Sequence, residues 1–212
     1  GKVVFTQKAR KLEKITIYNL SGQVVREIQF NYMVSGTVLT PRYYLESIVV
    51  TDIEKKQPED YHFDYYAPER LPAQGSRSID IWGYFNGSYT SSNPTLVPRQ
   101  TIITTTKRQS PNNPAFIENG DNVSLSFGSY LREADERFMI CGTLKEITYP
   151  TGSTDEFIYE AHRYRRNTDE AEIRIVGGLR IKQIKTKTKN KEIKVRTFKY
   201  GKDEDGNGMP II

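Results

Sequence analysis

A string of aromatic and polar residues in the middle of the chain has the composition of a ligand-binding surface. It contains Asp80, Trp82, Tyr84 and Asn86, with glycines between and after them. Aromatic rings stack on the faces of sugar rings, while carboxylate and amide groups hydrogen-bond to hydroxyl groups. These four residues therefore predict a platform for a carbohydrate or a peptide.

The same string also has a structural interpretation, which we favour. Gly83 and the pair Asn86 and Gly87 are typical of tight turns. A Trp or Tyr beside a turn commonly covers the end of a sheet while its polar atom bonds to the backbone. Ligand binding by this string is therefore kept as the alternative.

Residues that could carry catalysis are few. The chain has two histidines, His62 and His162, and one cysteine, Cys141. Neither histidine is accompanied by a nucleophile-elbow motif, and their different places in the repeat described below give no metal-ligand spacing. Cys141 follows apolar residues and is expected to be a buried, inert thiol. We predict no catalytic residue, no metal and no cofactor; an enzyme would require His162 and two carboxylates in one pocket.

Basic charge is concentrated near the end of the sequence. The chain carries a net charge of +5, and the segment 179–202 alone contains ten Lys or Arg against the single acid Glu192. A row of lysines can bind phosphates, but this segment lacks the interleaved aromatics typical of single-stranded nucleic-acid binding. Lysine on a sheet edge also discourages aggregation. We therefore predict a solvated strand and no nucleic-acid partner.

Composition indicates a folded chain rich in strands. Hydrophobic residues make up 36% of its 212 residues, and 14 Tyr and 9 Phe are among its aromatics. This argues against a disordered chain and favours β-structure. No apolar run approaches the roughly 18 residues that a membrane-spanning helix needs, so no membrane-spanning segment is expected.

An internal repeat organises the chain. A unit that begins with two apolar residues three apart and ends with Phe-x-Tyr occurs four times. The opening residues are Leu12, Leu45, Leu144 and Ile181, and the closing pairs are Phe30 and Tyr32, Phe63 and Tyr65, Phe157 and Tyr159, and Phe198 and Tyr200. Each unit alternates like a β-hairpin, so hairpins are predicted at about 10–33, 43–66, 143–164 and 178–201.

The fold class follows from these hairpins. A lone hairpin is marginal in water, so the four should form one mainly β region over residues 1–212, an extended, twisted antiparallel sheet. The rings of each closing pair share a face, so they should pair across neighbouring hairpins, with at least one ring per hairpin largely buried. The spacing of three between Leu12 and Ile15 breaks alternation. It predicts a β-bulge in each unit, or a strand that starts after the Leu.

An insert at about 66–142, rich in Pro, Asn, Ser and Gly, separates the second hairpin from the third. Within it, the segment 95–107 suits a strand, and Ser129 is expected to cap one short helix. The apolar face of that helix would comprise Leu131, Ala134, Phe138 and Cys141.

Three strings add a family likeness: Ser-Ile-Asp-Ile-Trp-Gly-Tyr-Phe-Asn-Gly at 78–87, Gly-Thr-Leu-Lys-Glu-Ile-Thr-Tyr-Pro-Thr-Gly at 142–152, and Gly-Gly-Leu-Arg-Ile at 177–181. Together with the hairpins they resemble the YD-repeat, or Rhs-like, segments of large secreted or surface proteins of Bacteroidetes. The family pattern has a second Gly where this chain has Ser153, and the fourth hairpin has Lys189-Asn190-Lys191 in place of a Gly turn.

The resemblance implies a segment of a longer exported, lipid-anchored protein at the extracellular or outer-membrane surface, in which such hairpins build a sheet or a shell. It implies no activity. We therefore predict a non-enzymatic structural or interaction segment, with protein or glycan at the cell surface as its partner. The alternative is a carbohydrate-binding module that uses the aromatic residues of the insert.

Overall fold

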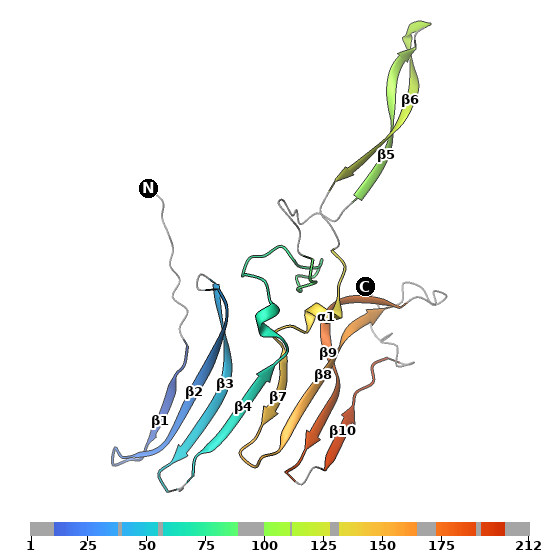
Figure 1. The fold of residues 1–212 in the computed structure, drawn as a ribbon. Helices are drawn as coiled ribbons and strands as arrows, with labels where there is room; N and C mark the ends of the chain where they lie inside the picture. The colour runs from blue at the N-terminus through green and yellow to red at the C-terminus, as the bar shows by residue number, and fades with distance from the viewer. Residues whose placement is uncertain are drawn as a thin grey trace, which may run out of the picture. The chain divides into compact units, whose positions relative to one another are not determined.

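The computed structural model describes residues 11–37, 40–54, 57–88, 100–110, 112–127, 132–164, 173–189 and 192–201. The chain is mainly β, with antiparallel strands and a short α-helix (Figure 1), as the hairpin repeat predicts. It divides into two compact units. The first comprises Gly1–Ala73, Ile140–Glu160 and Leu179–Ile212, and the second comprises Gln74–Met139 and Ala161–Gly178.

Eight strands form one antiparallel sheet in the order β1-β2-β3-β4-β7-β8-β9-β10 (Figure 1). They are β1 (Lys14–Tyr18), β2 (Val24–Thr37), β3 (Thr40–Asp52), β4 (Glu59–Tyr65), β7 (Leu144–Thr148), β8 (Thr154–Tyr164), β9 (Arg174–Lys187) and β10 (Ile193–Thr197). The pairs β1–β2, β3–β4, β7–β8 and β9–β10 are the four predicted hairpins, which are therefore confirmed.

The insert interrupts the sequence without interrupting the sheet. Strand β4 of the second hairpin pairs directly with β7 of the third, with Phe63 opposite Ile147 and Tyr65 opposite Leu144. The connection between these strands runs through the whole insert, so no tight turn holds them together. The junction is made by strand pairing between two repeat units, and backbone hydrogen bonds of Tyr66 with Gly142 and Thr143 continue it past the strand ends.

The predicted irregularity at the start of each unit is present in the first three. The register between β2 and β3 skips Glu46, and the register between β4 and β7 skips Lys145. Both residues directly follow the opening Leu of their unit. In the first unit β1 starts at Lys14, after Leu12. The spacing of three therefore marks a β-bulge or a strand start, as expected.

Each closing tyrosine forms the same hydrogen bond, which we call the tyrosine lock. Its hydroxyl group donates to the backbone carbonyl of the opening residue of its own hairpin. The four locks join Tyr32 to Leu12 at 2.8 Å, Tyr65 to Leu45 at 2.9 Å, Tyr159 to Leu144 at 2.8 Å and Tyr200 to Ile181 at 2.7 Å. The fourfold sequence repeat is therefore also a fourfold repeat of one bond.

The geometry of the lock is independent of turn length. When the register of each hairpin is continued to the opening Leu or Ile, the residue opposite it is the one just before the closing tyrosine. This holds in all four units. A bulge leaves a backbone group outside the regular ladder, and a backbone carbonyl needs a partner. In the second and third units, where the bulge is present, the tyrosine hydroxyl supplies that partner, so the Leu-x-x-Ile spacing and the Phe-x-Tyr ending act together.

The closing rings are partly covered, and none of the eight is fully buried. Seven of the eight rings in the closing pairs are half-buried, while Phe198 is 39% exposed. Two closing tyrosines do form ring pairs, but with tyrosines outside the closing pairs. The ring centroids of Tyr65 and Tyr44 lie 4.8 Å apart, and those of Tyr159 and Tyr66 lie 6.2 Å apart. The described residues of the first unit add only a 3-10 turn (η1, Pro68–Arg70), turns and connecting segments to the sheet, so the rings are not covered by a second layer within that unit.

The insert contains more strand than predicted. Strand β5 (Gln100–Ser110) agrees with the predicted strand from residue 100 onward, while 95–99 lie outside the described residues. It pairs with β6 (Asn113–Phe127), which was not predicted. Helix α1 is shorter than predicted, at Glu136–Met139, and Ser129 and Leu131 lie outside the described residues. In the described part of the chain, the helices are too short and polar to cross a membrane.

Candidate functional site

Asp80 organises the turn that carries the predicted platform. Its side chain is 0% exposed, and its Oδ1 accepts hydrogen bonds from the amides of Trp82 and Tyr84, both at 2.9 Å. Its own amide donates to the Tyr84 carbonyl at 2.8 Å. These bonds close a local turn of the kind that Asp favours. Asp80 therefore shapes the backbone of the site and offers no surface to a ligand.

A half-buried arginine connects the turn to the segment before α1. The Nη2 of Arg132 donates to the Asp80 carbonyl at 2.6 Å, and the Ile81 amide donates to the Arg132 carbonyl at 3.1 Å. Within the described residues, the Oδ2 of Asp80 and the Nε and Nη1 of Arg132 are buried without a hydrogen-bond partner. Unsatisfied buried polar atoms are costly, so these three atoms oppose the hydrogen bonds that hold the turn.

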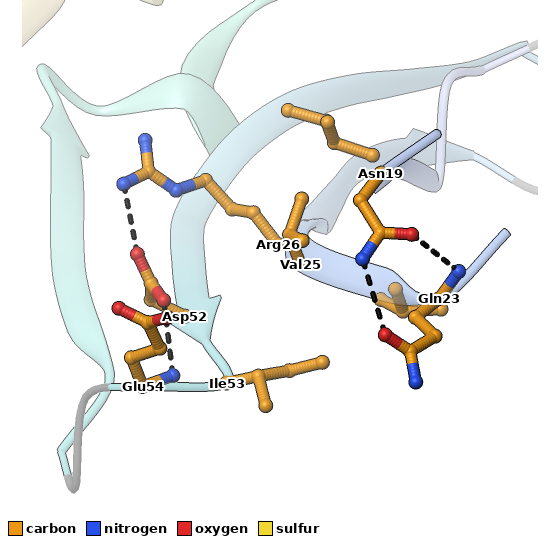
Figure 2. A pocket seen from close by; sticks show the side chains of 9 residues that line it. Asn19, Gln23, Val25, Arg26, Asp52, Ile53 and Glu54 are labelled. Carbon is orange, nitrogen blue, oxygen red and sulfur yellow. Dashed lines mark hydrogen bonds and ion pairs between the residues drawn. The ribbon is translucent and has the colours of Figure 1, made fainter. Parts of the chain in front are cut away.

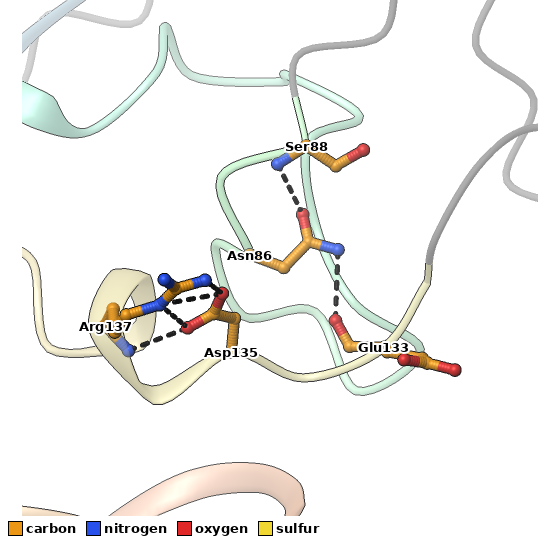
Figure 3. A network of polar contacts seen from close by, with 5 residues as sticks. All are labelled: Asn86, Ser88, Glu133, Asp135 and Arg137. Atoms are coloured by element: carbon orange, nitrogen blue, oxygen red, sulfur yellow. Dashed lines mark hydrogen bonds and ion pairs between the residues drawn. The ribbon is translucent and has the colours of Figure 1, made fainter.

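Asn86 has a structural role as well (Figure 3). It is 7% exposed, its Nδ2 donates to the Glu133 carbonyl at 3.2 Å, and its Oδ1 accepts from the Ser88 amide at 3.1 Å. Both ends of the carboxamide thus bind protein backbone. Asn86 links its own loop to the segment before α1, which leaves it no exposed group for a sugar hydroxyl.

The segment before α1 is fixed by a capping aspartate (Figure 3). The Oδ1 of Asp135 accepts from the Arg137 amide at 3.0 Å, and the Arg137 guanidinium also binds both carboxylate oxygens. Hydrogen bonds from Arg137 hold the pKa of the Asp135 carboxyl below its usual value. The pair helps α1 begin at Glu136, because the side chain replaces a partner that the first turn of a helix lacks.

Trp82 and Tyr84 are the two platform residues that face solvent, at 46% and 43% exposure. They lie against the glycine pair of β9. A Cβ on Gly177 would be 2.5 Å from the Trp82 Cβ, and a Cβ on Gly178 would be 3.5 Å from the Tyr84 hydroxyl. The absence of side chains at these two glycines lets both aromatic residues approach the strand.

Among the described residues, three of the four buried hydrophobic side chains belong to the second unit. Phe85, Met139 and Ala161 are buried there, and the rings of Phe85 and Phe138 meet edge to face at 5.4 Å. Gly87 permits this contact, because a Cβ at that position would lie 2.4 Å from the Phe138 ring. The turn that carries the exposed aromatic residues is therefore followed directly by a buried, packed ring, that of Phe85.

The residues considered for catalysis are dispersed among structural contacts. His62 is exposed, with its Nε2 3.0 Å from Asp60 Oδ2. His162 packs against Gly178. Cys141 is buried, and burial raises the pKa of its thiol, which opposes formation of a reactive thiolate. Among the described residues, no group of three His, Cys, Asp or Glu side chains is arranged to hold a metal ion.

A half-open pocket of about 510 Å³ lies where the turns of the first and second hairpins meet (Figure 2). Its apolar side chains are Ile17, Val24, Val25 and Ile53. Its polar groups bond to one another: Arg26 pairs with Asp52 at 3.0 Å. Nearby, Asn19 donates to Gln23 at 3.1 Å, and Asp52 accepts from the Glu54 amide at 3.1 Å.

Sequence reasoning missed this pocket, because its residues belong to turns that the repeat does not mark. It contains none of the four predicted platform residues, no aromatic ring and neither histidine. Its Arg and Asp are already paired with each other. The pocket therefore carries no catalytic arrangement, and the exposed aromatic pair of Trp82 and Tyr84 remains the better candidate for a ligand.

A scan of protein-family models found no match to the chain, and searches of curated proteins and of solved structures also found none.

Proposed function

We propose that the chain is a non-enzymatic structural segment of a cell-surface repeat protein, built from hairpins that join edge to edge. The observation that carries the proposal is the fourfold tyrosine lock, which recurs at the same position of every hairpin although the turns differ. A bond that recurs in this way serves to build the sheet. The surface location rests on the resemblance to YD-repeat segments.

The junction between β4 and β7 supports the same role. It joins two repeat units without a tight turn and uses the Tyr-opposite-Leu register that also joins β2 to β3. In repeat proteins, stability is approximately a sum of unit and neighbour-interface contributions. A further unit placed beside β10 should therefore be stabilised by the sheet and should stabilise it in return.

Appending a fifth hairpin tests this proposal. We expect a copy of residues 33–65, inserted directly after Tyr200, to reproduce the junction between the first and second units. One added interface of about 1–2 kcal/mol would raise the midpoint of thermal unfolding by about 2–8 °C. Circular dichroism measures the midpoint, and hydrogen exchange shows whether the copy is folded.

A matched control has the same length, but its copied segment carries substitutions that disrupt the strand junction. It carries Leu45→Asp and Ile48→Asp within the copied segment only, so that two carboxylates replace the apolar residues facing Tyr200 and Phe198. The control copy should exchange rapidly and leave the midpoint unchanged. If the unaltered copy behaves like this control, the hairpins are not a stackable repeat.

A carbohydrate-binding role is the second candidate, and the exposure of Trp82 and Tyr84 favours it. If sugars bind there, Trp82→Ala should reduce binding on a glycan array by about tenfold, because stacking on one aromatic ring contributes about 1 kcal/mol or more. Trp82→Phe should retain part of the binding, and Tyr43→Ala, at an exposed tyrosine of the sheet, should retain all of it. Equal binding by Trp82→Ala and the unaltered chain would exclude this role.

A further inference from the structure

Strands β1 and β10 are the two outer strands of the eight-stranded sheet. Both present apolar side chains to solvent: Leu12, Ile15 and Ile17 on or beside β1, and Ile193, Val195 and Phe198 on or beside β10. Exposed apolar edge strands are templates for pairing with another chain. The question is which strand fits these two edges.

The inner junctions of the sheet provide the pattern. At the β2–β3 junction, Phe30 lies opposite Ile48 and Tyr32 opposite Leu45. At the β4–β7 junction, Phe63 lies opposite Ile147 and Tyr65 opposite Leu144. In each case the closing Phe-x-Tyr of one unit meets the opening apolar pair of the next. Phe198 and Tyr200 are the fourth such ending, and Leu12 and Ile15 are the first such opening.

The backbone of β1 is oriented for this pairing. The Phe30 amide donates to the Glu13 carbonyl at 2.9 Å, so the peptide groups of Glu13 point toward β2. In an antiparallel strand the amide and carbonyl of one residue point to the same side, and the side alternates along the strand. The peptide groups of Thr16, three residues further on, therefore point to the open edge.

The backbone of β10 is oriented in the matching way. The Phe198 amide donates to the Lys182 carbonyl of β9 at 2.9 Å, so the preceding residue, Thr197, presents its peptide groups to the open edge by the same alternation. Applying the inner-junction register to the two edges sets Ile15 opposite Phe198 and hence Thr16 opposite Thr197. The two outward-facing residues would then form a hydrogen-bonded pair.

We infer that the partner of the β10 edge is the β1 edge of a second copy of this chain, in the register that sets Leu12 opposite Tyr200 and Ile15 opposite Phe198. This inference rests on the proposed structural role, because it uses the same junction between units. The contact is head to tail, so each copy retains one open edge, and association produces open-ended rows.

One like-charge pair limits the strength of this contact. The same register sets Lys14 opposite Lys199, and like charges directly opposite each other are unfavourable. Lys14 is partly compensated by Glu27, whose carboxylate lies 2.9 Å from its Nζ. The association should therefore be weak at low ionic strength, and added salt should strengthen it by screening the repulsion.

Sedimentation velocity of the full chain tests the inference. Oligomers should grow with protein concentration, and Lys199→Glu should tighten association by about fivefold, since it turns a repulsive pair into an attractive one worth about 1 kcal/mol. Lys189→Glu, which changes charge by the same amount in the turn before β10, is the matched control and should have a smaller effect. Monomers at every concentration for both the unaltered chain and Lys199→Glu would overturn the inference.

Two blocked variants test the head-to-tail direction. Thr16→Pro and Thr197→Pro each remove an outward-facing amide while the ladder of the residue's own hairpin keeps its bonds. Each variant alone should be monomeric, and an equal mixture should form dimers, because each supplies the edge that the other has lost. Dimers of either variant alone, or a monomeric mixture, would contradict the head-to-tail contact.

The appended-hairpin experiment separates the two proposals. If a fifth hairpin stabilises the chain while separate copies do not associate, the structural role stands and only the contact between copies is wrong. If neither occurs, this junction does not stabilise neighbouring repeat units, and both proposals fail.

Discussion

Replacing all four lock tyrosines by phenylalanine should lower the free energy of unfolding by about 2–4 kcal/mol. Each replacement removes one hydroxyl that donates to a backbone carbonyl, at about 0.5–1.5 kcal/mol per bond, and changes at separate sites add. The bond of Tyr32 is solvent-exposed and those of Tyr65, Tyr159 and Tyr200 are part-buried, so the last three should contribute most. Urea unfolding followed by circular dichroism measures the loss.

The control for this experiment is a tyrosine outside the repeat. Tyr18 is exposed at the end of β1, and Tyr18→Phe should leave the unfolding free energy within a few tenths of a kcal/mol. A quadruple variant as stable as Tyr18→Phe would mean that the four bonds do not contribute to the sheet.

Asp80→Ala should destabilise the second unit by about 2–4 kcal/mol. The substitution leaves two backbone amides, those of Trp82 and Tyr84, without their acceptor in a part-buried turn, and an unsatisfied buried group costs about 1–3 kcal/mol. Thermal unfolding and the fluorescence of Trp82, the single tryptophan of the chain, report the loss.

Asp80→Asn separates the hydrogen-bonding role from the charge. The carboxamide keeps an acceptor oxygen for the two amides, and it places an amide group where Oδ2 has no described partner. We expect a loss of less than about 1 kcal/mol. An Asp80→Asn variant as unstable as Asp80→Ala would indicate that the negative charge, and not the turn geometry, is what the site requires.

The hairpins could be predicted because their signals are local. Alternation, turn residues and the recurring Phe-x-Tyr ending all lie within one unit, and the spacing from Leu45 to Ile48 encodes a bulge that the register of β3 confirms. The lock itself was not predicted. The bond depends on the register, which places each tyrosine one position past the residue opposite the opening Leu or Ile. Because the turns differ in length, the sequence spacing between the two residues varies and does not reveal this relation.

Other features depend on contacts that the sequence does not mark. Strand β6 contains Pro114, Gly120 and several polar residues in its first part, which lacks the alternation that identifies a strand. Only the last five residues, 123–127, alternate. Burial of the closing rings was expected because a shared aromatic face needs cover. The described residues of the first unit supply no second layer, and rings such as Phe198 stay accessible.

The predicted ligand platform divides into two pairs. Sequence reasoning treated Asp80, Trp82, Tyr84 and Asn86 as one set, because composition does not distinguish a residue that shapes a turn from one that the turn displays. The structure buries Asp80 and Asn86 in backbone contacts and leaves Trp82 and Tyr84 exposed. The role of Gly177 and Gly178 beneath these rings could not be read from a segment so distant in sequence.

Amide hydrogen exchange in the four single Tyr→Phe variants tests the repeat most directly. If each lock serves its own hairpin, every variant should exchange faster in the strands of its altered unit, with the largest change next to the opening Leu or Ile, and the other three units should change less. Unchanged exchange around Leu45, Leu144 and Ile181 in their own variants would contradict the account, because the recurring bond would then be a coincidence of geometry.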